Sequence, residues 1–187
     1  MLSLLTLSFN NILKKSPLDE EKTKDTIINV ITLLNDTIIS TRELTADLYP
    51  TMLDDLGYIP AIKWHTETVM KPNEINTSLR IDDRVESLST EVKLSLFRVI
   101  QESLHNIIKH ASATEVLIEL ITLWSTLKLS VKDNGNGFDT DKIKEKIEKG
   151  IGFRLMKERA ISIGGIFKLD STIDKGTEII IEIPVQT

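Results

Sequence analysis

The positions of the glycines divide this chain into two parts of different character. All eight glycines lie at Gly57 or later, and seven of them lie from Gly135 onward. Glycine weakens helices and supplies tight turns, so the first third of the chain is suited to helix and the last third to strands and loops. We therefore expect a helical element over residues 1–48 and a mixed domain after it.

The helical element is expected to be a hairpin that dimerises. Apolar residues recur three and four positions apart over residues 26–48, as on one face of a helix, and a shorter segment over 2–13 repeats the pattern. Such a hairpin cannot bury its apolar stripe alone, so we expect two copies to form a four-helix bundle and the protein to be a homodimer. The stripe consists of Ile27, Val30, Ile31, Leu34, Ile38, Leu44 and Leu48.

The rest of the chain predicts a connector and an α+β domain. Prolines mark the connector over residues 49–72, with a short helix over 61–70, and the domain follows over 73–187. The order is strand, helix, strand pair, loop, helix, strand pair, which predicts helices on one face of a mostly antiparallel sheet. Residues 90–110 have helical spacing, and β-branched residues mark strands at 78–81, 116–123, 127–132, 166–171 and 178–185.

Composition excludes several classes of function. The net charge is -5 and no run of Lys or Arg exceeds two residues, so direct nucleic-acid binding is not expected. With no cysteine and three histidines, a disulfide scaffold, a cysteine nucleophile and a zinc site are not expected either. No apolar stretch suits a signal peptide or a membrane span, so we expect a cytoplasmic chain without membrane contact. A membrane anchor in a segment upstream of this sequence remains an open alternative.

Asp133-Asn134-Gly135-Asn136-Gly137 is the sharpest local motif, because it directly follows a predicted strand. Two glycines two apart permit positive φ and close approach of the backbone to a ligand, while Asp133 offers a carboxylate acceptor. Taken alone, the motif is equally typical of an Asx-rich hairpin turn. A calcium loop is excluded, since Gly135 and Gly137 occupy positions that need oxygen ligands.

A second group of polar residues shares one side of the helix predicted over residues 90–110. Glu102, Asn106 and His110 are four apart, with Lys109 beside them. The side-chain oxygen of Asn106 suits magnesium, although a solvated helix face has the same pattern. Two weaker motifs follow: a Gly-x-Gly at the start of a helix, which could present backbone donors to a phosphate, and a turn that opens the last strand. They are Gly150-Ile151-Gly152 and Gly176-Thr177-Glu178.

In this order, the four motifs resemble the ATP-binding domain of sensor histidine kinases, which belongs to the superfamily of gyrase, MutL and related ATPases and has the Bergerat-type fold. The segment from Leu48-Tyr49-Pro50 to Gly57, with Ala61 and Trp64, is similar to the joint between dimerisation helices and ATPase domain in the nitrate-sensor and DesK-type subfamily. Met156-Lys157-Glu158-Arg159-Ala160 and Gly164-Gly165 resemble the same subfamily.

The resemblance implies a role for each residue at the base end of a bound nucleotide. Asp133 would accept a hydrogen bond from the adenine amino group, and Gly135 and Gly137 would let the chain pass close to the purine. Thr177 would contact the nucleotide side of the sheet. ATP is therefore the implied cofactor.

The phosphate end is implied in the same way. Asn106 would bind Mg²⁺, and Glu102 would hold a metal-bound water or polarise the surroundings of the γ-phosphate. Lys109 and His110 would meet phosphate oxygens. A lid over the nucleotide would hinge at Gly150 and Gly152.

The implied activity is that of a two-component histidine kinase, which transfers phosphoryl from Mg-ATP to a histidine and then to the Asp of a response regulator with a LuxR-type output domain. This chain departs from the pattern twice. Leu155 stands where the subfamily has a glycine, and Arg154 could compensate with side-chain donors. No histidine precedes His65, so autophosphorylation is not expected from this sequence, whether because it is shortened or because the acceptor was lost.

Two alternatives to the kinase remain open. One is an ATP-dependent regulatory switch or an anti-sigma-type serine kinase of the same superfamily. The other is a dimeric interaction module with degenerate glycine loops, which only Leu155 favours.

Overall fold

The computed structural model describes residues 57–140 and 151–184, all of which lie in the compact unit Met52–Thr187. The helical hairpin predicted over residues 1–48 and the first residues of the connector lie outside these ranges, as does Gly150. No helix in the two described stretches is long and apolar enough to cross a membrane.

The helices and strands follow the predicted order. The helix predicted over residues 90–110 is α5, but it does not stay α-helical to its end, because its last turn widens into the π-turn η4. The elements are α4 (Tyr58–Met70), η2 (Lys71–Asn73), β1 (Asn76–Ile81), η3 (Asp83–Ser87), α5 (Thr90–Asn106), η4 (Ile107–Ala111), β2 (Glu115–Leu123), β3 (Thr126–Asp133), α7 (Ile151–Ser162), β4 (Ile166–Thr172) and β5 (Gly176–Pro184).

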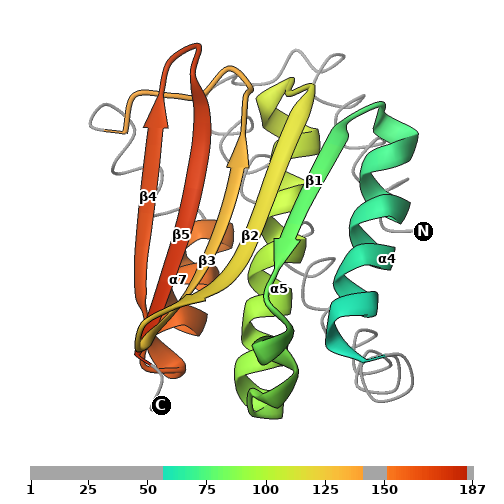
Figure 1. Ribbon diagram of the computed structural model, residues 1–187. Helices are drawn as coiled ribbons and strands as arrows, with labels where there is room; N and C mark the ends of the chain where they lie inside the picture. The colour runs from blue at the N-terminus through green and yellow to red at the C-terminus, as the bar shows by residue number, and fades with distance from the viewer. Residues whose placement is uncertain (1–56, 141–150, 185–187) are drawn as a thin grey trace, which may run out of the picture. The chain divides into compact units, whose positions relative to one another are not determined.

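The five strands form one sheet in the order β1-β2-β3-β5-β4, in which only β1 and β2 are parallel. Figure 1 shows α5 and α7 on the same face of this sheet and α4 beside β1. The predicted mostly antiparallel sheet with helices on one face is confirmed. Because strand side chains alternate between faces, the apolar residues at every second position of β2, β3 and β5 point toward the helices and are buried.

The core lies between the sheet and the helices α5 and α7. Leu120 and Leu129 are opposite one another on β2 and β3, and both are fully buried. From the helix side, Ser103 of α5 lies against Met156 of α7, with 3.7 Å between Oγ and Sδ, and Met156 is fully buried. This packing fixes the middle of α7 relative to the second half of α5.

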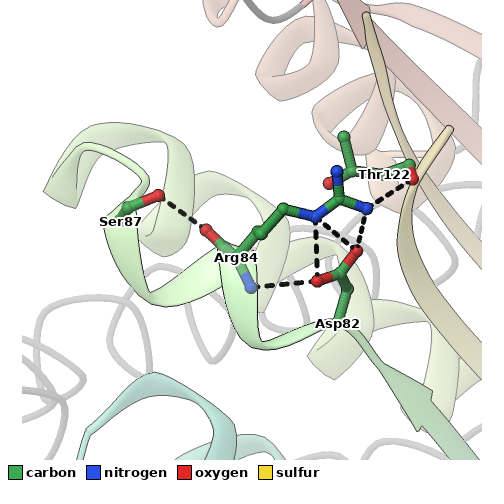
Figure 2. A network of polar contacts seen from close by, with 4 residues as sticks. All are labelled: Asp82, Arg84, Ser87 and Thr122. Atoms are coloured by element: carbon green, nitrogen blue, oxygen red, sulfur yellow. Dashed lines mark hydrogen bonds and ion pairs between the residues drawn. The ribbon is translucent and has the colours of Figure 1, made fainter. Parts of the chain in front are cut away.

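The segment between β1 and α5 is held by charged side chains. Asp82 and Arg84 form an ion pair, and Arg84 also donates to the carbonyl of Thr122 on β2 at 2.8 Å (Figure 2). The hydrogen bonds from Arg84 lower the pKa of Asp82 to about 2. Farther along η3, Glu86 accepts the backbone N–H of Ile59 at 2.9 Å and so caps α4.

Candidate functional site

Asp133 is the last residue of β3 and is only 5% exposed. Its carboxylate accepts the backbone N–H of Gly135 at 2.8 Å. Burial raises the pKa of Asp133 above its ordinary value, while hydrogen bonds from the backbone of Gly135 and Thr177 oppose that rise. A carboxylate has about four acceptor positions, so two backbone donors leave capacity for a donor on a ligand.

The two glycines after Asp133 are needed for different reasons. Gly137 has φ 54° and lies against the carbonyl of Thr172. Gly135 does not have positive φ. Gly135 is required by close approach instead, because a Cβ there would overlap the carbonyl of Ala111 at the end of η4. The N–H of Asn136 donates to that same carbonyl at 2.7 Å.

Asn134 positions this loop, a role that the sequence did not predict. Its Oδ1 accepts the backbone N–H groups of Thr114 and Glu115 at 2.9 and 3.0 Å, and its Nδ2 donates to Thr114 Oγ1 at 2.9 Å. The end of β3 is thereby tied to the start of β2. The only signal in the sequence was an Asn directly after a strand, where its side chain can bond backbone groups.

Gly176 brings the start of β5 against Asp133. It is buried with φ 86°, and a Cβ there would overlap the Asp133 carbonyl. Thr177, the next residue, is half-buried and directs its backbone N–H at the Asp133 carboxylate. The structure thus brings together the four predicted base-end residues: Asp133, Gly135, Gly137 and Thr177.

Glu102, Asn106 and Gly152 form a second group between α5 and α7. Asn106 Nδ2 donates to Glu102 Oε1 at 3.4 Å, and both side chains are half-buried. The same Glu102 oxygen occupies the space where a Cβ on Gly152 would lie. Gly152 itself lies in the first turn of α7, as the sequence predicted for a glycine at the start of a helix.

Lys109 and His110 are exposed on η4, the segment whose last residue, Ala111, contacts Gly135. Partial desolvation lowers the pKa of His110, with further contributions from the charges of Lys109 and His105. Arg154, the residue that could compensate for Leu155, is paired with Glu158 one turn along α7 at 3.7 Å.

The donor set suits magnesium bound together with a nucleotide. Within the described ranges, no group of three or more His, Cys, Asp or Glu side chains could hold a metal ion by itself. Mg²⁺, however, keeps several waters and is commonly bound by one or two protein oxygens together with substrate phosphates. The amide oxygen of Asn106 and the carboxylate of Glu102 fit that mode.

Comparison with known proteins decides the family. Residues 91–187 match the family described as "Histidine kinase-, DNA gyrase B-, and HSP90-like ATPase". The chain belongs to this family. The predicted resemblance to the ATP-binding domain of sensor histidine kinases is confirmed, and the fold class with it.

Curated relatives of this histidine kinase-type ATPase carry kinase names. The signal transduction histidine-protein kinase/phosphatase DegS of Bacillus subtilis (strain 168) is 34% identical over 142 residues, which are 73% of this chain and 36% of that protein. The sensor histidine kinase ComP of the same organism is 32% identical over 163 residues, or 87% of this chain and 21% of that protein. The chain therefore spans about a third or less of these relatives.

A solved structure supports the fold of this ATPase domain. The histidine kinase domain of the blue-light activated histidine kinase from Erythrobacter litoralis EL346 superposes with a TM-score of 0.63 at 16% identity, covering 98% of this chain and 94% of that one.

Proposed function

We propose that this chain binds Mg-ATP and is the catalytic part of a two-component sensor histidine kinase. The observation that carries the proposal is the buried carboxylate of Asp133, which ends β3 next to the backbone N–H of Thr177 and keeps acceptor capacity for a ligand. Burying a charge costs free energy of folding, so a buried carboxylate in this position indicates that it recognises a ligand.

Asp133 recognises the base by accepting the amino group of adenine. Guanine carries a carbonyl at the same ring position, which would place an acceptor against the carboxylate. Donor–acceptor mismatch at a buried polar group is strongly unfavourable, so the site selects ATP over GTP. The close contacts of Gly135 with Ala111 and of Gly176 with the Asp133 carbonyl support this role, since they hold the carboxylate in one place.

The phosphate end is formed by α5, η4 and the start of α7. When bound, magnesium neutralises phosphate charge during phosphoryl transfer. Asn106 holds the ion through its side-chain oxygen, and Glu102 orients that amide through the hydrogen bond from Asn106 Nδ2. Lys109 and His110 are exposed on η4 and supply donors to phosphate oxygens. A lid is proposed to hinge at Gly152, in the first turn of α7, and at Gly150, which lies outside the described residues.

The phosphoryl group goes to a histidine and then to the aspartate of a response regulator with a LuxR-type output domain. Because the three histidines of this sequence include none before His65, the acceptor is proposed to come from another chain or a preceding segment. Residues 1–48 are proposed to form the dimerisation hairpin, residues 49–72 the connector and residues 73–187 the ATP-binding domain. We place the protein in the cytoplasm.

Calorimetry with ATP tests the metal role. The parent is titrated with ATP in magnesium and in EDTA, beside Asn106→Ala and Asn73→Ala, whose exposed amide lies near the end of α4. Magnesium should strengthen ATP binding to the parent and to Asn73→Ala but not to Asn106→Ala. An equal magnesium effect in all three proteins would remove Asn106 from the site.

Phosphoryl transfer is tested by mixing the chain with labelled ATP and a separate dimerisation segment that carries a histidine. Acid-labile label should appear on that segment and not on this chain. Acid-stable label on a serine of a partner protein would instead support the anti-sigma-type kinase.

A further inference from the structure

Ser171 on β4 makes three polar contacts with two other segments of the site. Its Oγ accepts the backbone N–H of Phe138 at 2.9 Å, lies 2.9 Å from Thr177 Oγ1 and lies 3.2 Å from the carbonyl oxygen of Gly176. No motif in the sequence pointed to this serine, which lies 33 residues after Phe138.

The strand register places Ser171 in one row with Asp133. Ser171 is opposite Thr177 in the pairing of β4 with β5. Lys132 is opposite Glu178 in the pairing of β3 with β5, so the next step of that antiparallel ladder brings Asp133 to Thr177. Side chains in such a row point to the same face of the sheet. Ser171, Thr177 and Asp133 therefore form a row across three strands on the helix side.

One arrangement of the hydroxyl hydrogens satisfies all three of these contacts. A hydroxyl has one donor and two acceptor positions. The Phe138 N–H occupies one acceptor position of Ser171. If the Ser171 hydroxyl donates to the Gly176 carbonyl, the Thr177 hydroxyl donates to the second acceptor position of Ser171 and all three contacts are satisfied. Thr177 Oγ1 then has only lone pairs left for a ligand.

We propose that Ser171 is a positioning residue for base selection, acting through Thr177. Because the Thr177 hydroxyl donates its hydrogen to Ser171 Oγ, it can only accept a hydrogen bond from the nucleotide. The base therefore faces two acceptors, Thr177 Oγ1 and the Asp133 carboxylate. Two acceptors suit the amino group of adenine and disfavour the carbonyl of guanine. This inference rests on the proposed binding of ATP at Asp133.

A second consequence concerns the loop that leaves the site. With its N–H held by Ser171, Phe138 places its ring against Phe153 of α7 in an edge-to-face pair with centroids 6.2 Å apart. Ser171 thus connects the base end of the site to the first turn of α7, where Gly152 meets Glu102.

The test compares the ratio of ATP to GTP affinity in the parent, Ser171→Ala, Ser171→Thr and Ser162→Ala. Ser171→Ala frees the Thr177 hydroxyl to donate, so the ratio should fall about fivefold to tenfold. Ser171→Thr keeps the hydroxyl and should restore the ratio. Ser162→Ala, which removes an exposed hydroxyl bonded to the Arg159 carbonyl at the end of α7, should leave it unchanged.

Three outcomes separate the claims. A parent that binds neither nucleotide overturns the proposed function itself. Equal losses of ATP and GTP affinity in Ser171→Ala, or no loss at all, overturn the role of Ser171 while leaving ATP binding intact. If Ser171→Ala does not fold, Ser171→Cys replaces it, because a thiol keeps the shape of the side chain but is a poor acceptor, and an unchanged ratio there also overturns the proposal.

Discussion

Glu102 Oε1 occupies the space that a side chain on Gly152 would need. This contact joins α5, which carries the polar side proposed to bind magnesium, to the first turn of α7. A glycine is therefore required here because there is no room for a side chain. Backbone conformation does not require it, since Gly152 has no positive φ. Because the atom in the way is the end of a flexible side chain, it can yield without disturbing the backbone.

Gly152→Ala should consequently fold but bind Mg-ATP poorly. Alanine favours a helix over glycine, so the free energy of unfolding should stay within about 1 kcal/mol of the parent. The displaced Glu102 carboxylate would leave Asn106, and magnesium-dependent ATP affinity should fall. In a Glu102→Ala background the same substitution should cause no further loss of affinity. A fully additive loss in the double variant would show that the two residues act separately.

Gly176→Ala should destabilise the fold far more than Gly164→Ala. Both glycines have positive φ, 86° and 73°, but a Cβ at Gly176 would meet the backbone of Asp133, whereas nothing lies within 4 Å of one at Gly164. Backbone strain alone costs about 1 kcal/mol at Gly164, and overlap with a fixed carbonyl should raise the loss at Gly176 to about 3 kcal/mol or more. Urea unfolding measures the free energy of unfolding of both variants. Equal losses would contradict the close approach of Gly176 to the Asp133 backbone.

His65 should make the protein less stable as the pH falls. Burial lowers the pKa of His65 from 6.5 to about 4. The centroid of its ring lies 5.4 Å from that of Phe97. Between these values the unfolded state binds the proton and the folded state does not, so stability is lost as pH decreases from about 6.5 to 4, by at most about 3 kcal/mol. His65→Gln should flatten this part of the curve of unfolding free energy against pH. Parallel curves for the two proteins would disprove the assignment.

Dimerisation is predicted from the apolar stripe of residues 26–48. Ile31→Glu combined with Leu34→Glu would place two charges in that stripe and should give monomers. Sedimentation should report the change in mass, while ATP affinity should match that of the parent, since the site residues lie from Glu102 onward. A parent that is already monomeric would contradict the expected hairpin dimer.

The parts of the fold that local patterns encode were predictable. β-branched residues at 116–123 and 127–132 identified β2 and β3, and a carboxylate directly after the second run located Asp133 at a strand end. Helical spacing identified α5 but not the π-turn over Ile107–Ala111, since apolar spacing over one turn does not separate the two geometries.

Contacts between distant segments were not predictable in the same way. Gly135 is needed because Ala111 lies against it, and only the folded chain brings those residues together. The bonds from Asn134 to Thr114 and from Phe138 to Ser171 likewise depend on which strands are neighbours. A serine or an asparagine in a turn is common, so composition alone did not identify either residue.

Asp133→Asn, measured by calorimetry with ATP and GTP beside a thermal unfolding curve, tests the central claim most directly. The amide oxygen can still accept the backbone N–H of Gly135, so the protein should stay folded, and the unfolding curve checks this. Losing the charge-assisted bond to adenine, about 1.5–3 kcal/mol, should weaken ATP binding by about tenfold to a hundredfold. A folded Asp133→Asn protein that binds ATP as tightly as the parent would show that this carboxylate does not recognise the base.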